Sequence, residues 1–322
     1  MNKITTNSNV VVRSKHFGEY PASDFADSLQ TVKDNGYALE FIEDQTDEIC
    51  LAAVTNRGLA LQWVKHQTPE ICFAAIRSNP WAIEYAESPS RELCLVAVQL
   101  DPKTVKVIKN LDETVARIAV EHRPTVIQYI QNPSDTVVMA CLYHDPLCIQ
   151  MVENPSKESA MFAVSKNGLA LQFIDSQTED LCKLAVEQNW QALEFVEDQT
   201  LDICKAAIQQ NVRALSLVRF QTSELIEWAI ELNPSAIQYV ENQTPELCIK
   251  AIEKDPYVYT LIRNPQKEVT TRAIQLEPDL LRYVTSQTYE LCELAVKRNP
   301  MALCWVKLEN VFPTLARLAR TP

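Results

Sequence analysis

The stretch that decides the fold is QTDEICLAAVTNRGLALQWVKH, residues 45–66, because its pattern returns every 22 residues without an insertion. The pair that opens it, Gln45-Thr46, has its last counterpart at Gln287-Thr288, so twelve consecutive blocks share one spacing. A fixed short period indicates a repeat array in which each unit packs on its sequence neighbours. We therefore expect one elongated domain, although a chain of 322 residues would otherwise suggest two or three compact ones.

The first half of each block predicts a short α-helix. We number the 22 positions of a block from one, so that Gln45 is position one. Position two is Thr, Ser or Asp in every block except the one with Gln266, and these side chains cap helix N-termini. A carboxylate stands at position four in ten of the twelve blocks, where the helix dipole favours it. Position nine is Ala in eleven blocks and Cys141 in the other, and position ten is always Val, Ile or Leu. These residues form one apolar face whose small side chain lets a neighbouring helix come close.

The second half of each block predicts another helix. Asn or Asp followed by Pro or Gly stands near position thirteen, as at Asn79-Pro80, and marks a capped helix start. The apolar residues that follow are assigned to the core, as in Ala60, Leu61, Trp63 and Val64. Two helices of about eight to ten residues would be marginal alone, so stacking has to supply the stability. The expected fold class is all-α, a solenoid or superhelix of about 13 short antiparallel helical hairpins with a 22-residue period.

The two ends depart from the pattern in the way that terminal repeats do. In the block that opens at Ser23, the cysteine position holds Ser28 and the alanine position holds Thr31, and Arg317 stands where alanine would be after Glu309. Polar residues on an unpaired outer face keep a terminal repeat soluble. We expect residues 1–22 to be a tail or cap, residues 23–308 to hold 13 repeat units, and residues 309–322 to be a capping half-repeat.

Composition and charge narrow the class of protein. A net charge of -12 argues against a protein that binds the phosphate backbone, and no apolar run is long enough for a signal peptide or a membrane span. We therefore expect a cytoplasmic protein without membrane contact. Seven of the ten cysteines share position six, and packed helices about 8 to 10 Å apart exceed the roughly 7 Å limit between bridged Cα atoms. We expect these cysteines to be reduced core residues: Cys50, Cys72, Cys94, Cys182, Cys204, Cys248 and Cys292.

Two phrases of the repeat resemble a known family. Gln-Thr-Pro-Glu-Leu-Cys-Ile-Lys-Ala-Ile at residues 243–252 and Asn-Gly-Tyr-Ala-Leu-Glu-Phe at residues 35–41 are similar to short helical repeats of unknown function from large DNA viruses, phages and some bacteria. The resemblance covers roughly residues 23–308, whereas the blocks at Leu111, Pro133 and Pro155 depart from the Gln-Thr-x-Glu pattern. It implies a viral or phage-related origin, and it implies no catalytic residue and no cofactor.

One cluster has the residue types of a metal site. Cys141, His144 and Cys148 lie three or four residues apart, and His122 precedes His144 by one repeat. Cysteine and histidine at this spacing on a helix can face one zinc ion. The structural explanation is stronger, because both cysteines replace small core residues and a histidine near a helix C-terminus is favourable by itself. We therefore expect no metal and no cofactor, and keep the four residues as a weak candidate.

Residues outside the repeated core are the candidates for binding a partner. Exposed aromatic side chains are typical of protein interfaces, and the aromatic candidates are Tyr37, Trp81 and Tyr257 at second helices and Tyr143 and Trp228 on first helices. Gln128 and Gln150 belong to a polar column with one side chain per unit, which resembles how some repeat proteins read nucleic acid. A solvated helix face is the alternative, and the acidity of the chain favours it.

No motif indicates an enzyme, since the chain has four histidines and lacks a glycine-rich phosphate loop, a nucleophile elbow and an HExxH pair. We expect a non-enzymatic scaffold that binds a macromolecule, most readily a protein, and a host or defence factor if the origin is viral. The alternatives are a nucleic-acid-binding or nucleotide-binding array, an acidic mimic of nucleic acid and, with the least support, a metal-dependent enzyme. The blocks from Leu111 to Asn154 lack both Gln and the position-six Cys, and we expect the partner to bind there.

Overall fold

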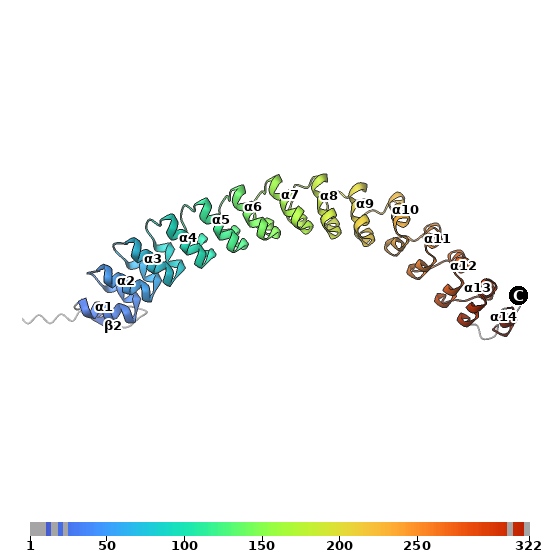
Figure 1. Ribbon diagram of the computed structural model, residues 1–322, viewed down its shortest axis with the longest axis horizontal. Helices are drawn as coiled ribbons and strands as arrows, with labels where there is room; N and C mark the ends of the chain where they lie inside the picture. The colour runs from blue at the N-terminus through green and yellow to red at the C-terminus, as the bar shows by residue number, and fades with distance from the viewer. Residues whose placement is uncertain (1–10, 14–18, 22–24, 308–311, 319–322) are drawn as a thin grey trace, which may run out of the picture. The chain divides into compact units, whose positions relative to one another are not determined.

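The computed structural model describes residues 11–13, 19–21, 25–307 and 312–318. Within these residues the chain is a helical repeat solenoid, as the sequence predicts (Figure 1). Each repeat is an α-helix followed by a short 3-10 helix, here labelled η, and one more α-helix ends the described part. The predicted fold class is confirmed.

The α-helices of the repeats have ten residues each. Their bounds are α1 Phe25–Asp34, α2 Asp47–Asn56, α3 Pro69–Ser78, α4 Arg91–Leu100, α5 Glu113–His122, α6 Asp135–His144, α7 Lys157–Lys166, α8 Glu179–Gln188, α9 Leu201–Gln210, α10 Ser223–Leu232, α11 Pro245–Lys254, α12 Lys267–Leu276, α13 Tyr289–Arg298 and the shorter α14 Phe312–Leu318. The 3-10 helices are η1 Gly36–Phe41, η2 Gly58–Trp63, η3 Pro80–Tyr85, η4 Pro102–Lys106, η5 Pro124–Tyr129, η6 Pro146–Met151, η7 Gly168–Phe173, η8 Trp190–Phe195, η9 Val212–Leu217, η10 Pro234–Tyr239, η11 Pro256–Leu261, η12 Pro278–Tyr283 and η13 Pro300–Trp305.

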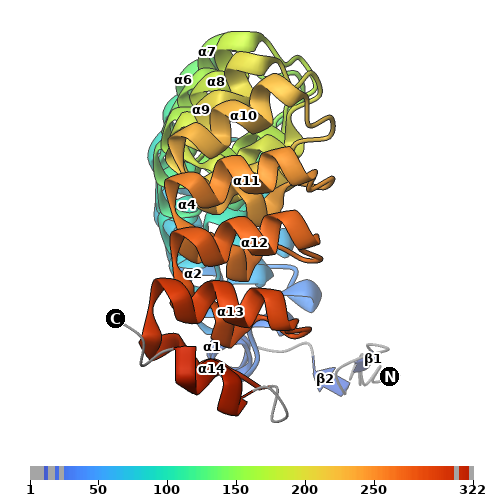
Figure 2. The same cartoon turned by 90° about the vertical axis from the view of Figure 1, so that its right-hand side faces the viewer.

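Two compact units divide the chain, Met1–Phe162 and Ala163–Pro322, and their boundary falls inside α7. Within each unit the α-helices lie side by side in one layer and the 3-10 helices form the second, as Figure 2 shows for α11 to α13. The core lies between these layers. Positions five, six, nine and ten of the α-helix and positions sixteen and seventeen of the 3-10 helix supply most of it, and the position-nine alanines, such as Ala185, are fully buried.

The caps explain where each helix begins. The hydroxyl of Thr46 accepts a hydrogen bond from the Ile49 amide, and the same bond recurs at most α-helix starts. Asn79 likewise accepts from the Trp81 amide at the start of η3, where Pro80 fixes the first backbone angle. Gln266 makes no cap bond, in keeping with its place as the one exception among the cap residues. The predicted starts of both helices are therefore confirmed.

The second helix differs from the prediction in type and length. It has 3-10 geometry and six residues, or five in η4, where we expected eight to ten. A ten-residue α-helix in a 22-residue repeat leaves twelve residues for the second helix and both turns, and 3-10 geometry covers more length per residue. The tighter winding also changes which residues face the core. Position nineteen, assigned to the core at Trp63, is only half-buried there and is exposed at Tyr283, so that assignment was wrong.

A glutamine side chain joins consecutive repeats at the ends of their 3-10 helices. The Gln199 side-chain amide donates to the Leu193 carbonyl of η8 at 2.9 Å and to the Leu217 carbonyl of η9, in the next repeat, at 3.1 Å. Its oxygen accepts from the Arg219 amide at 2.8 Å. The corresponding glutamines make all or most of these bonds, and they are Gln45, Gln67, Gln177, Gln221, Gln243 and Gln287. We call this arrangement the glutamine bridge.

The position-six cysteines belong to the same bridge. The Cys182 thiol lies 3.4 Å from the Gln177 amide oxygen, and Cys50, Cys72 and Cys292 have the same partner in their own repeats. Nine of the ten cysteines are buried and free, and only Cys304 is exposed. Burial raises the pKa of the Cys204 and Cys248 thiols to about 11, so both stay protonated at neutral pH. The expectation that these cysteines are core residues is confirmed.

The turn is rebuilt where the glutamine is missing in the middle of the chain. Asn110, Asn132 and Asn154, each directly before the residue that replaces Gln, have positive φ angles of 51°, 46° and 50°. Asparagine tolerates this left-handed conformation better than other residues with a side chain. These three blocks therefore have a left-handed backbone conformation at the residue before position one.

The ends of the chain lie partly outside the described residues. β1 (Val11–Arg13) and β2 (Glu19–Pro21) pair antiparallel with Val12 opposite Tyr20, a strand pair that the sequence analysis did not predict. Of the predicted half-repeat 309–322 the structure describes only α14, on which Arg317 is exposed. The other residues of the predicted segments 1–22 and 309–322 lie outside the described residues. In the part of the chain that the structure describes, no helix combines the length and apolar character needed to cross a membrane.

The glutamine bridge predicts the effect of Gln199→Ala. The variant loses the three backbone bonds that join two repeats and leaves partly buried groups without partners, at a cost of about 1–3 kcal/mol in the free energy of unfolding. Urea denaturation should show this loss as a lower midpoint. Gln210→Ala is the control, because Gln210 is exposed at the end of the neighbouring α9, and it should move the midpoint little. Equal shifts for the two variants would contradict the bridge.

The burial of the cysteines predicts their reactivity. In the native protein at pH 8 a thiol reagent should modify one cysteine per chain quickly, Cys304, because the buried thiols are shielded and those with raised pKa values remain protonated. The other nine should react only after unfolding. A colorimetric thiol assay on the wild type and Cys304→Ser tests this, since the variant should lose the fast phase entirely. Several fast thiols in the native variant would show that the cores open readily.

Candidate partner-binding surface

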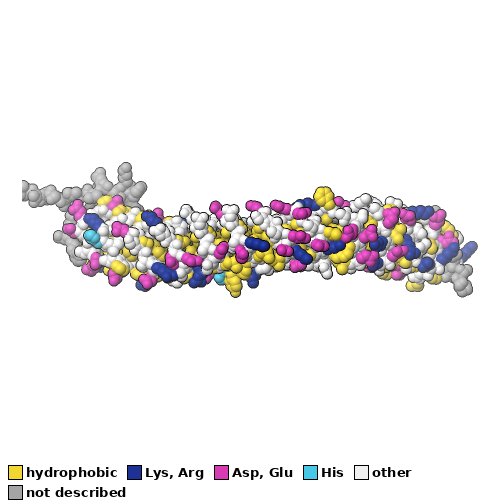
Figure 3. All heavy atoms as spheres, turned by 90° about the horizontal axis from the view of Figure 1, so that it is seen from above, with side chains coloured by type: hydrophobic (Ala, Val, Ile, Leu, Met, Phe, Trp, Pro, Cys, Tyr) yellow, Lys and Arg dark blue, Asp and Glu magenta, His cyan; other side chains and the backbone are white. Residues whose placement is uncertain are grey.

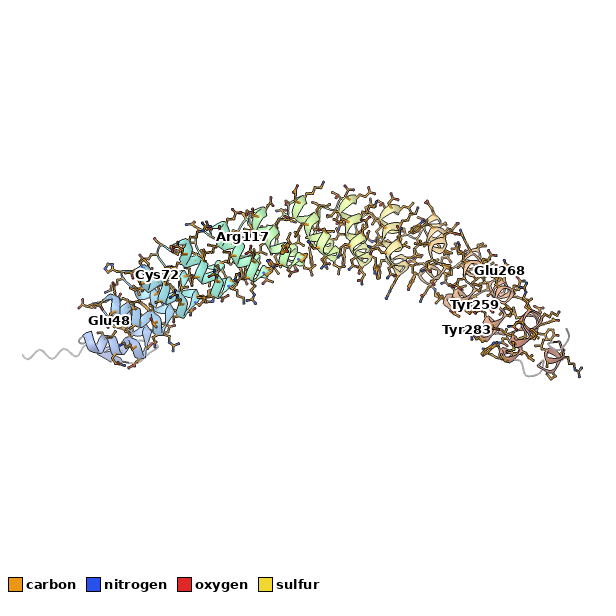
Figure 4. The ribbon with its side chains drawn as sticks, viewed as in Figure 1. Glu48, Cys72, Arg117, Tyr259, Glu268 and Tyr283 are labelled. Carbon is orange, nitrogen blue, oxygen red and sulfur yellow. The ribbon has the colours of Figure 1, made fainter. Side chains whose placement is uncertain are left out.

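Three repeat positions line the exposed side of the 3-10 helices: fifteen, eighteen and nineteen. Side chains from neighbouring repeats meet there, since the Tyr37 ring lies 5.4 Å from the Trp63 ring in an edge-to-face contact. The Lys106 ammonium lies 5.7 Å from the centre of the Tyr129 ring in the next repeat. We call this surface the 3-10 face. Within the second unit it faces away from the α-helices, as Glu268 on α12 and Tyr283 on η12 illustrate (Figure 4).

Within each unit, position nineteen gives the 3-10 face a column of apolar side chains. None of them is buried, and Tyr129 and Tyr283 expose 38% and 45% of their surface. Repeated exposure of aromatic side chains is typical of a partner-binding surface, whereas a core would bury them. The column consists of Phe41, Trp63, Tyr85, Val107, Tyr129 and Met151 in the first unit and Phe173, Phe195, Leu217, Tyr239, Leu261, Tyr283 and Trp305 in the second.

The column is densest in aromatic rings over η1, η2 and η3. We call the five rings there, Tyr37, Phe41, Trp63, Trp81 and Tyr85, the aromatic cluster; all five are half-buried, and the three helices lie side by side. Contacts hold some of them in place, because the Arg57 guanidinium lies 6.0 Å from the centre of the Tyr37 ring and the Trp81 indole donates to Asp101 at 3.0 Å. Rings fixed before binding lose little entropy when a partner binds.

Carboxylates surround the aromatic cluster. Residues 35–46, 57–66 and 79–88 hold five carboxylates against two lysine or arginine side chains. Glu40 and Glu84 stand at position eighteen, directly beside the rings, and both are exposed. An aromatic surface with excess carboxylates attracts cationic side chains by charge and by cation–π contact, and it repels phosphate.

The predicted aromatic residues fall into two groups. Tyr143 and Tyr257 are exposed by 69% and 50%, as expected. Tyr37, Trp81 and Trp228 are half-buried and already have contacts within the chain, the last with Lys205, whose ammonium lies 5.8 Å from the ring centre. Tyr37, Trp81 and Tyr257 belong to the 3-10 face, whereas Tyr143 and Trp228 lie on α-helices, so the five do not form one site.

Gln128 and Gln150 are exposed on the 3-10 face, as predicted. The Gln128 amide, however, donates to the Thr125 carbonyl of its own helix at 2.7 Å. Gln62 and Gln172 make the same bond within their helices. An amide that is already bonded to its own backbone is less suited to read bases one by one.

The four residues of the weak metal candidate are divided between core and surface. Cys141 and Cys148 are fully buried, whereas His122 and His144 are exposed. Cys141 donates to the Pro124 carbonyl and Cys148 to the Asp145 carboxylate, both at 3.4 Å, and a His122 ring nitrogen lies 3.0 Å from the Ile118 carbonyl. Among the described residues no group of three or more potential ligands is arranged to hold a metal ion. The structure therefore does not bring the four candidates together.

The outer side of the α-helices differs between the two units. In the second unit, cations of one helix reach carboxylates of the next, as in Lys250 with Glu227 at 3.0 Å and Arg272 with Glu253 at 2.7 Å. Charges of both signs are interspersed over this part of the chain (Figure 3). In the first unit, the corresponding positions are mainly half-exposed apolar side chains such as Leu51, Phe73 and Leu95.

The carboxylates with clearly lowered pKa values do not form an acid–base pair. Hydrogen bonds from Lys254 and Lys267 lower the pKa values of Glu231 and Glu290, and both carboxylates are exposed on α-helices. The pKa of Glu246 is lowered by its own backbone amide and by Thr244 in a helix cap. These shifts have structural causes and indicate no catalytic group.

Comparison with other proteins adds no relative. No protein-family model, curated protein or solved structure matches this chain.

Proposed function

We propose that this protein is a non-enzymatic scaffold that binds a protein partner through the 3-10 face, with the aromatic cluster as the anchor. The observation that carries the proposal is the column at position nineteen, where every repeat has an apolar side chain that is half-buried or exposed. Aromatic anchors held in fixed positions contribute most of the binding energy in protein interfaces. A repeat array adds one such anchor per repeat, so its surface fits an extended partner.

The charge around the aromatic cluster supports a partner segment with lysine or arginine side chains. Glu40 and Glu84 stand beside the rings, so a cation that stacks on Trp63 or Tyr85 also has a carboxylate within the same surface. A segment that alternates apolar and basic residues matches this pattern, whereas an acidic segment does not.

The second candidate is a nucleic-acid-binding array, and one local feature favours it. Lys103, Lys106 and Lys109 stand at successive exposed positions of one repeat, beside the aromatic cluster. The carboxylates of the cluster and the net charge of -12 oppose phosphate binding over the rest of the surface. We therefore rank a protein partner above nucleic acid, and above the idea that the chain itself mimics nucleic acid.

The cysteines and the motif resemblance support a proposal for where the protein acts and for its origin. Nine buried free thiols suit a reducing compartment, so we propose the cytoplasm. The similarity of residues 243–252 to viral and phage repeats supports a viral or phage-related origin, in which case the partner is a host or defence factor. No cofactor or metal is needed for this function.

Replacing Tyr37, Trp63 and Trp81 together by serine tests the proposal. The immobilised full chain is exposed to a nuclease-treated soluble extract of the organism that carries the gene, and proteins that it retains are identified and their affinities measured. Because truncating one anchor costs about 2 kcal/mol or more, affinity should fall at least roughly thirtyfold. Circular dichroism confirms that the variant is folded.

The matched control replaces Leu51, Phe73 and Leu95, apolar side chains on α2, α3 and α4, by serine. Retention that survives this change but not the first supports the 3-10 face. The reverse result places the interface on the α-helices and refutes the proposal. Tight binding of labelled oligonucleotides at low salt, with affinity that falls steeply as salt rises, would favour the nucleic-acid alternative.

A further inference from the structure

The glutamine bridge defines a small binding site that is repeated along the chain. At a bridged interface the carboxamide lies between two carbonyls, from positions seventeen and nineteen of adjacent repeats, and one amide, from position twenty-one. In four repeats the thiol of the position-six Cys approaches the carboxamide oxygen as well. The two carbonyls accept from the NH2 group and the amide donates to the oxygen, so the site is complementary to a primary amide.

A cavity lies where Pro89 replaces the glutamine, and residues at the corresponding repeat positions line it. This cavity, the Pro89 crevice, has a volume of about 420 Å³, and Ile83, Val107, Lys109 and Cys94 line it. They correspond by repeat position to the two carbonyls, the amide and the thiol of a bridged interface. No side chain of the described residues bonds to these carbonyls or to the Lys109 amide, because the proline side chain has neither a donor nor an acceptor.

A second cavity follows at the next interface, where Leu111 replaces the glutamine. This Leu111 crevice has a volume of about 560 Å³, and it is lined by Val105, Tyr129 and Gln131, which hold the repeat positions of the two carbonyls and the amide. Asn110, with its positive φ, rebuilds the turn beside Leu111. Both crevices lie within the first unit, and Lys106 and Tyr129 connect the second crevice to the 3-10 face.

The chemistry of the crevices selects among possible occupants. A carboxylate would place its oxygens against two carbonyls and be repelled, and an ammonium group would leave the backbone amide without an acceptor. A primary amide can satisfy all three backbone groups, as Gln45, Gln67, Gln199, Gln221 and Gln287 do at five other interfaces. Each crevice is larger than one such group needs, so the backbone next to the amide can also enter.

We propose that the Pro89 and Leu111 crevices bind glutamine side chains of the partner polypeptide, which would complete the interrupted bridge from outside. This inference rests on the proposed function, because it supplies a chemical feature of the same protein partner. Neighbouring repeats are about 8 to 10 Å apart, and residues three apart in a polyproline II segment lie on one face about 9 Å apart. The favoured segment therefore has the form Gln-Pro-Pro-Gln in an extended conformation.

The test uses the full chain and two synthetic peptides with free C-terminal carboxylates. One contains Gln-Pro-Pro-Gln and the other contains Glu-Pro-Pro-Glu, which has the same shape but lacks the NH2 groups. Amide NMR signals are followed while each peptide is added to millimolar concentration. The Gln peptide should shift the signals of Lys109 and Gln131, and the Glu peptide should bind roughly tenfold more weakly or not at all. The amide of Glu197, which already donates to Gln177, serves as the internal control.

A self-filled variant, Pro89→Gln with Leu111→Gln, provides the second arm. Its own glutamines should occupy both sites, raise the urea midpoint and weaken Gln-peptide binding at least roughly tenfold. Pro89→Ala removes the proline without filling the crevice and should bind the peptide as the wild type does. Equal binding of both peptides, undiminished binding by the self-filled variant, or the absence of any shift would overturn the inference.

The outcome for the natural partner separates this inference from the proposed function. If a protein retained by the wild type is also retained by the self-filled variant but lost from the serine variant of the aromatic cluster, the crevices are not the site and the 3-10 face stands. If the chain retains no protein and still binds the Gln peptide, the crevices stand and the proposed partner class fails. Loss of the partner from the self-filled variant supports both.

Discussion

The structure depends on one constraint: the backbone groups at the end of a 3-10 helix need partners, and at seven interfaces a glutamine between two repeats supplies them. A short 3-10 helix leaves carbonyls without partners inside itself, and six residues offer little cooperative stability. The glutamine carboxamide resolves this because it donates to carbonyls of two repeats and accepts from an amide in the second. The contact that caps the 3-10 helix is therefore also the contact that joins neighbouring repeats.

The sequence predicted the α-helix of each repeat better than the second helix. Threonine caps, first-turn carboxylates and buried alanines such as Ala185 follow rules that hold for any α-helix, and each was confirmed. The second helix begins as predicted at Asn or Asp, but its type could not be predicted from apolar spacing. Positions sixteen, seventeen and twenty fit one face of either an α-helix or a 3-10 helix, and packing against the next repeat decides between them.

Only part of the candidate surface was predicted, again because the type of the second helix could not be predicted from apolar spacing. With an α-helix assumed, Trp63 and its equivalents belong to the core, whereas 3-10 winding brings them to the surface. The role of glutamine was missed although a signal was present: Gln and Cys occur together at positions one and six in six of the blocks. Such pairing indicates contact between the two side chains, and the 3.4 Å approach of Cys182 to Gln177 is that contact.

The interruptions of the bridge have a meaning that composition alone does not give. Cys94 retains the residue type that elsewhere faces a glutamine, yet Pro89 stands in the glutamine position. The two carbonyls and the amide are backbone groups that every repeat has, so Cys94 is the side chain of the bridge that this repeat retains beside a cavity of about 420 Å³. Losing the bridge costs stability at that interface, and an array with many bridged interfaces tolerates the loss because each contributes locally. Two adjacent interfaces can thus give up internal bonds and offer the same groups to a partner.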